Sequence, residues 1–443
     1  MTIAHVIIFL GLLIFLSHFF NSLFSKTRIP NVLLLLLIGI IIGPIAGLVD
    51  KSFMGQFGTV FTTVTLIIIL FESGTGLKFA DIGKAIGSAT MLTLWNFIST
   101  VIIAALIANV FGGLNWLSSV FVGAIIGGTS SAVVIPMVNQ LKLNDKPKTV
   151  LFLESAISDV LCLVVGLAVL EGMKAGALSI GGVFSKMGMS FLFALLIGVA
   201  AGFIWSIILK LVRGIKNSMF TNFAFVFILY GVVELLNLNG GIAALAFGVI
   251  LGNAEFINNS KWYQKVFLFK TTSLNANEKD FFGEIVFLVQ TYFFVYVGVC
   301  IQFGNFWSYL IGLIIVGIIV LIRPFGIRVF AAKKAEPRDL AIMSIMTPKG
   351  LVPAVLASLP LQYGLKGGET IQDMGYSIVL FSILICSILV ILVSKDPLIM
   401  SRFIGRKKGK QEKPTNELSY ENAENEEVVI QPDQADDLSP KDD

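Results

Sequence analysis

The chain has 443 residues, of which 56% are hydrophobic and only 14% charged, and its mean hydropathy is +0.88. A soluble domain carries about 25% charged residues, so this composition is that of a membrane protein rather than of a soluble enzyme or binding module. The formal net charge of +4 is small and does not indicate a nucleic-acid-binding surface.

Apolar stretches of about 20 residues recur along the chain, and each is long enough to cross a hydrocarbon layer of about 30 Å. They lack the alternation of barrel strands, and unpaired backbone groups are not tolerated in lipid, so helices are predicted. The first stretch has no basic segment before it and no clear cleavage site, which favours a retained helix over a signal peptide. We predict an all-α polytopic membrane protein with about thirteen spans, near residues 3–24, 31–49, 57–75, 85–111, 115–141, 148–170, 187–212, 218–237, 240–254, 281–303, 306–332, 339–362 and 374–395.

The basic residues of the loops predict the orientation. Loops after even-numbered spans hold little beyond Lys51, Lys174, Lys186 and Lys366. Because lysine and arginine accumulate in short cytoplasmic loops, the N-terminus is expected outside and the C-terminus inside. Loops after odd-numbered spans hold Lys26, Arg28, Lys78, Lys84, Lys142, Lys146, Lys148, Lys210, Arg213, Lys216, Lys261, Lys265, Lys270, Lys279, Lys333, Lys334 and Arg338.

Two spans contain helix breakers. Span five includes "IIGGTSSAVVIP", residues 125–136, and span twelve includes "IMTPKGLVPA", residues 345–354. Proline and glycine can simply kink a membrane helix, but non-helical backbone in a membrane must be buried in protein or line a cavity. Because one such span lies in each half, we predict an inverted-repeat transporter with its site between the repeats. The six-helix repeats would cover about 1–172 and 218–395, joined by a linker helix at about 187–212.

Span six contains two acids in the stretch "FLESAISDVLCL", residues 152–163. Asp159 and Ser155 are four residues apart and share one helix face. An acid within the membrane is costly and is a functional candidate by default, although neighbouring donors alone could satisfy it. With Thr129 and carbonyl groups of the broken span five, this face could bind a monovalent cation. A carboxylate that holds either a proton or a cation is sufficient for exchange.

Glu154 points away from that face and is expected to pair with a buried cation, because buried charges usually pair. Arg323 in span eleven is the best partner, unless it anchors the cytoplasmic end of its span. Lys349 in the second broken helix could compensate half-helix dipole charge or extend to the membrane surface. Glu72 could line a cytoplasmic funnel or cap a helix, and Asn96 could face the site or bridge helices.

The sequence after residue 397 differs in composition from the transmembrane domain, residues 1–397. A basic cluster is followed by the acidic stretch "ENAENEEVVIQPDQADD", which has too little apolar surface to fold. We expect residues 398–443 to form a disordered cytoplasmic tail whose basic part can lie on anionic lipid. Three cysteines and two histidines show no ligand spacing, so no cofactor is expected and the cysteines are interpreted as apolar fillers.

The ordered motifs "RIPNVLLLLLIGIIIGP", "GGTSSAVV", "ESAISD", "NGGIAALAFGVILGN", "FFVYVGVCIQF" and "TPKGLVPAVLA" resemble those of the monovalent cation/proton antiporter superfamily. The chain is most similar to the prokaryotic NhaP-type branch and its sodium/proton exchanger relatives. The resemblance implies an ion at Asp159, oxygen ligands from Ser155 and Thr129, and a Glu154–Arg323 pair. It also implies crossed broken helices, homodimers, elevator-like movement and a prokaryotic inner membrane.

Two positions depart from the family pattern. Ser158 stands where the family has Asn or Asp, and Ser130 stands where an acid often follows the threonine of span five. Fewer carboxylates favour electroneutral exchange and could favour K⁺. We therefore predict a secondary transporter, not an enzyme, that exchanges Na⁺ for H⁺ at Asp159. The alternatives are K⁺/H⁺ exchange and, from another class, Na⁺-coupled symport of an organic anion.

Overall fold

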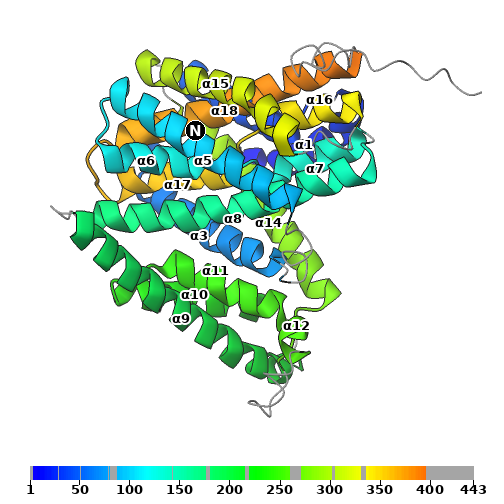
Figure 1. The fold of residues 1–443 in the computed structure, drawn as a ribbon. Helices are drawn as coiled ribbons and strands as arrows, with labels where there is room; N and C mark the ends of the chain where they lie inside the picture. The colour runs from blue at the N-terminus through cyan, green and yellow to red at the C-terminus, as the bar shows by residue number, and fades with distance from the viewer. Residues whose placement is uncertain are drawn as a thin grey trace, which may run out of the picture. The chain divides into compact units, whose positions relative to one another are not determined.

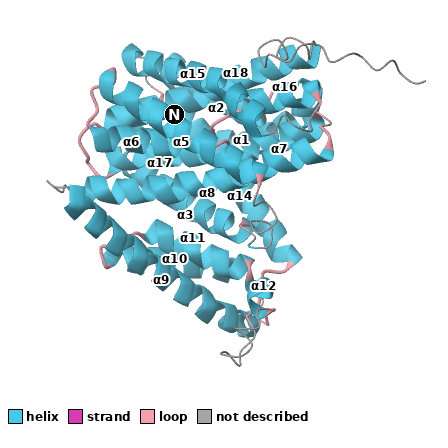
Figure 2. Cartoon of the chain, in the orientation of Figure 1, coloured by secondary structure: helices cyan, strands magenta, loops and turns pink. Residues whose placement is uncertain are grey.

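The structure is a computed structural model, which describes residues 3–27, 29–49, 51–77, 79, 87–141, 143–175, 180–214, 219–259, 271–301, 305–330 and 336–395. The described residues form helices and connecting loops, with no strand among them (Figure 2). The expected tail at 398–443 and several of the lysine-bearing loops lie outside these ranges.

Each of the thirteen expected spans corresponds to a helix or a broken helix among the described residues, which confirms the prediction of an all-helical membrane protein. Among the described residues, eight helical segments, counting the broken span five as one, are long and apolar enough to cross a membrane, and the other spans match shorter apolar helices. The helices are α1 (Ile3–Thr27), α2 (Asn31–Ile40) with the π-helix η1 (Ile41–Ile45), α3 (Lys51–Gly76), α5 (Ser88–Val110), α6 (Trp116–Ile126), α7 (Ser131–Gln140), α8 (Asp145–Ala175), α9 (Ile180–Val212), α10 (Phe220–Leu235), α11 (Gly240–Gly252), α12 (Ala254–Asn258), α14 (Ala276–Cys300), α15 (Phe306–Phe330), α16 (Pro337–Ile345), α17 (Leu351–Gln362) and α18 (Gly368–Lys395).

The helices pack in two groups. One group contains α1, α2, α3, α9, α10, α11 and α14, and the other contains α5 to α8 and α15 to α18. In Figure 1, α8 runs between α9–α11 on one side and α5, α6 and α15 on the other. Glycines bring the helices of the first group close together: a Cβ on Gly248 of α11 would overlap the Phe71 carbonyl oxygen of α3. Such close contacts indicate dense packing between the helices of this group.

Spans five and twelve are broken as predicted. The first break separates α6 from α7, and the second separates α16 from α17. The breaks meet, because the backbone N–H of Ser130 donates to the Pro348 carbonyl oxygen at 2.8 Å. A Cβ on Gly350 would overlap the Ser130 side chain, so the second break needs glycine at this point. The two broken helices therefore cross at their unwound segments.

Two of the expected breakers lie inside helices instead. Pro136 removes one bond of the α7 ladder without ending the helix. Pro353 occupies the first turn of α17, where a backbone N–H has no partner within the helix, so proline is tolerated there. The first break therefore falls at the Gly127–Gly128 stretch and the second at Pro348 and Gly350, not at every glycine and proline of the two motifs.

Candidate functional site

Side chains of α8 bind the backbone of the first break. The N–H groups there have no helical partner, and buried donors of this kind need one. Three of them donate to consecutive polar groups on one side of α8: Gly128 to Cys162 Sγ at 2.9 Å, Thr129 to Ser158 Oγ at 3.0 Å and Ser131 to Asp159 Oδ2 at 3.2 Å. The interpretation of Cys162 as only an apolar filler is therefore wrong, because its sulfur accepts a hydrogen bond from the break.

Asp159 is held by the first residue of α7. Besides its N–H, Ser131 donates its hydroxyl to the same carboxylate oxygen at 2.6 Å, the length of a charge-assisted hydrogen bond. Sequence reasoning missed Ser131 and selected its neighbour Ser130. The signal that could have identified Ser131 is its position directly after the glycines, where a helix restarts with unpaired N–H groups.

The Asp159 carboxylate lines a cavity of about 310 Å³ between the two helix groups. Glu72 of α3 lines the same cavity, as the funnel interpretation expected. The site therefore has a second carboxylate that the motif comparison did not count. Gln290 of α14, which the sequence favours as a packing or interface residue, also lines this cavity, together with Ser130 and Ser131.

Two of the predicted oxygen ligands point elsewhere. The Ser155 hydroxyl donates to the Phe152 carbonyl oxygen at 3.0 Å and is fully buried. Serine in a helix commonly makes this local bond, which turns the hydroxyl back along its own helix. Thr129 lines a separate, smaller cavity. Ser158 lies between them, accepting from the Thr129 N–H and donating to the Ser155 carbonyl oxygen at 3.2 Å.

Glu154 and Arg323 form a buried ion pair. The guanidinium donates to both carboxylate oxygens, at 2.6 and 2.9 Å, and the two residues are 1% and 3% exposed. Asn96 of α5 donates to Glu154 Oε1 at 2.8 Å, so it bridges helices and joins the pair. Arg323 Nε donates to the Met343 carbonyl oxygen at 2.8 Å. The pair therefore links α8, α15 and α5 to the last turn of α16.

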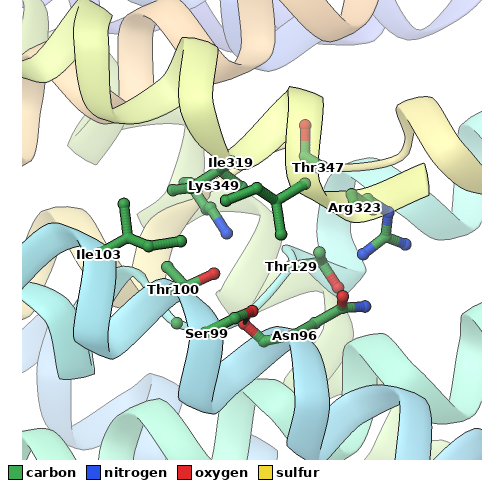
Figure 3. Close-up of a pocket in the computed structure, with 11 residues that line it drawn as sticks. Asn96, Ser99, Thr100, Ile103, Thr129, Ile319, Arg323, Thr347 and Lys349 are labelled. Carbon is green, nitrogen blue, oxygen red and sulfur yellow. Dashed lines mark hydrogen bonds between the residues drawn. The ribbon is translucent and has the colours of Figure 1, made fainter. Parts of the chain in front are cut away.

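Lys349 crosses from the second break to the first. Its Nζ donates to the Gly128 carbonyl oxygen at 2.7 Å. Its backbone N–H donates to Ser382 Oγ at 2.9 Å. A buried ammonium at the end of α6 compensates the partial negative charge of a helix C-terminus. Figure 3 shows Lys349 and Thr129 facing a cavity of about 10 Å³, room for about one water molecule. At 2% exposure Lys349 does not extend to the surface.

A comparison with protein families matches residues 11–395 to the family described as sodium/hydrogen exchanger, transmembrane. Among curated proteins, the chain is 24% identical over 394 residues to the K(+)/H(+) antiporter NhaP2 of Shewanella baltica, covering 85% of this chain and 64% of that protein. The chain thus spans less than two thirds of the length of this relative. It is 25% identical over 369 residues to the Na(+)/H(+) antiporter 1 of Methanocaldococcus jannaschii, covering 79% of this chain and 82% of that protein.

Among solved structures, the sodium proton antiporter MjNhaP1 of Methanocaldococcus jannaschii at pH 8 has the same fold. The TM-score is 0.67 at 21% identity, and the match covers 92% of this chain and all of that one. The similarity agrees with the helix arrangement and the crossed breaks described above.

Proposed function

Because the chain belongs to the sodium/hydrogen exchanger family, we propose that it is a secondary transporter that exchanges a monovalent cation for H⁺ at Asp159. The observation that supports this most is the position of the carboxylate. Asp159 lies in a membrane-spanning helix, beside unwound backbone, and lines a cavity between the two helix groups. An acid in this position is retained against a cost of about 2.5–3.5 kcal/mol, which is expected only where it has a role.

In the proposed cycle, Asp159 holds a cation or a proton and is not exposed empty to the other side. Ser130 and backbone carbonyl groups of the break supply oxygen ligands, joined by Ser155 and Thr129 if their hydroxyls turn toward the ion. Hard monovalent cations prefer such oxygen donors. Movement of the helix group that carries Asp159 against the other group would expose the site alternately.

We propose Na⁺ as the first candidate, in line with the name of the Methanocaldococcus jannaschii relative. K⁺ is the second candidate, because the Shewanella relative is named a K⁺/H⁺ antiporter. Ser130, where the family often has an acid, and Ser158, where it has Asn or Asp, also give the site a lower charge. We assign one exchangeable acid, and therefore electroneutral exchange, because Asp159 is hydrogen-bonded to the break, whereas Glu72 belongs to the other helix group.

The family resemblance and the basic loops support three further proposals. The chain would lie in a prokaryotic inner membrane with its N-terminus outside and its C-terminus in the cytoplasm. It would form homodimers through the helix group that does not carry Asp159. Its basic segment after residue 397 would lie on anionic lipid.

The test uses everted membrane vesicles with an acidic interior and a dye that reports ΔpH. Addition of Na⁺, Li⁺ or K⁺ should dissipate ΔpH for the wild type but not for Asp159→Asn. The cation that dissipates ΔpH is identified as the substrate. The matched control is Asp373→Asn, which removes another buried acid, located in α18 away from the cavity, and should retain exchange. If the inserted wild type responds to no cation across a pH series, the proposal fails. Na⁺ uptake stimulated by an organic anion without proton exchange would favour the symporter instead.

A further inference from the structure

The contact between Ser131 and Asp159 is unequal for the two carboxylate oxygens. Both donors of Ser131, the hydroxyl at 2.6 Å and the N–H at 3.2 Å, reach Oδ2. In the part of the chain that the structure describes, no other hydrogen bond to this carboxylate is found. Oδ2 is therefore fixed to the start of α7, and Oδ1 remains for the cavity.

These two donors stabilise the unloaded carboxylate. Hydrogen bonds to a charged group contribute about 1.5–3 kcal/mol, and the N-terminus of α7 adds the partial positive charge of its dipole. A bound cation must share the negative charge that these donors already neutralise in part. The donors therefore weaken the hold of Asp159 on a cation and favour its release.

We propose that Ser131 is a positioning residue that sets the affinity of the exchange site for its monovalent cation, by holding Oδ2 of Asp159 and stabilising the carboxylate between two loads. This inference rests on the proposed exchange at Asp159. It assigns a role to a residue that is distinct from the ligand set implied by the family resemblance. It also explains how a site with a buried acid can release its ion within a transport cycle.

The fold allows one donor or both donors of Ser131 to be removed. Ser131→Ala removes the hydroxyl and keeps the N–H. Ser131→Pro removes both, and proline is favoured at the first position of a helix. The preceding residue, Ser130, has φ −69° and ψ 116°, a conformation that is compatible with a following proline. Ser131→Thr keeps both donors and places its extra methyl group beside the cavity, so it serves as the conservative variant.

The experiment measures exchange by purified protein in proteoliposomes at alkaline pH, where protons compete least, with a titration of NaCl and of KCl. For Ser131→Ala we expect KM for the exchanged cation to fall about tenfold or more, the equivalent of one charge-assisted hydrogen bond. The maximal rate should fall as well, because a tightly held ion leaves slowly. Ser131→Pro should lower KM further, and Ser131→Thr should keep the wild-type KM and maximal rate.

The outcomes separate the two proposals. If KM is unchanged or rises while the maximal rate falls, Ser131 has only a structural role and the inference is wrong. If Ser131→Thr behaves like Ser131→Ala, the hydroxyl is not the group that acts, and the inference is also wrong. If Asp159→Asn retains exchange in the same assay, the proposed function itself fails. Size-exclusion profiles of the variants in detergent show whether a lost rate is only lost folding.

Discussion

Replacing Glu154 with glutamine should destabilise the protein strongly, because it leaves Arg323 charged and buried without its partner. The guanidinium is 3% exposed and donates to both oxygens of Glu154. Removing one member of a buried ion pair costs about 3–5 kcal/mol. Glutamine keeps the shape and one oxygen that can still accept from Asn96, so we expect a cost near the lower end, about 3 kcal/mol.

The assay is reversible unfolding in mixed micelles, followed by the fluorescence of the five tryptophans. A double-mutant cycle with Arg323→Met completes the measurement. The double variant should cost less than the sum of the single variants, with an interaction energy of up to about 3 kcal/mol, because it leaves no unpaired charge.

The control is the ion pair between Lys174 and Glu171, whose side chains are 27% and 13% exposed. Lys174→Met should cost only about 0–1 kcal/mol, since water screens a partly exposed pair. If Glu154→Gln costs no more than this control, or if the double variant costs the full sum, the buried pair does not stabilise the fold as argued.

Two further substitutions test the crossing and the helix packing. Lys349→Met should lower the free energy of unfolding by about 1–3 kcal/mol, because it leaves the Gly128 carbonyl group buried without its donor, and the same micelle titration measures it. Gly248→Ala should cost about 1–3 kcal/mol through overlap with the Phe71 carbonyl group, whereas Gly231→Ala in α10, which meets nothing within 4 Å, should be neutral or stabilising. Equal effects of the two glycine variants in that titration would refute the role of close packing between α3 and α11.

The sequence predicted the spans and the breaks because these depend on local properties. Hydropathy over about 20 residues and the placement of glycine and proline are sufficient to find them. The partner of Glu154 could also be predicted from the sequence, because few basic residues occur within the spans. The contacts of the first break could not be predicted in the same way. A helical wheel places Ser155 on the face of Asp159, but it does not show that the Ser155 hydroxyl bonds the Phe152 carbonyl oxygen. Ser131 lies beyond unwound backbone, where the spacing of 100° per residue does not apply.

The structure also shows a similarity between the two halves that the sequence comparison had overlooked. In α8, Ser158 and Cys162 are four residues apart and accept hydrogen bonds from the first break. In α18, Ser382 and Cys386 have the same spacing, and Ser382 accepts a hydrogen bond from the backbone N–H of Lys349 in the second break. A serine of the neighbouring long helix, Ser158 in α8 and Ser382 in α18, therefore binds the backbone of each unwound segment.

The two halves differ in the charged residues near these supports. The residue after the serine is Asp159 in α8 but Ile383 in α18, so only the first half carries a carboxylate at this position. The second half carries a cation in its break, Lys349, which extends to the Gly128 carbonyl oxygen of the first. The repeat thus provides two similar supports, whereas the acid and the compensating ammonium come from different halves and meet at one crossing. This asymmetry agrees with the proposed role of Asp159 as the exchanging acid.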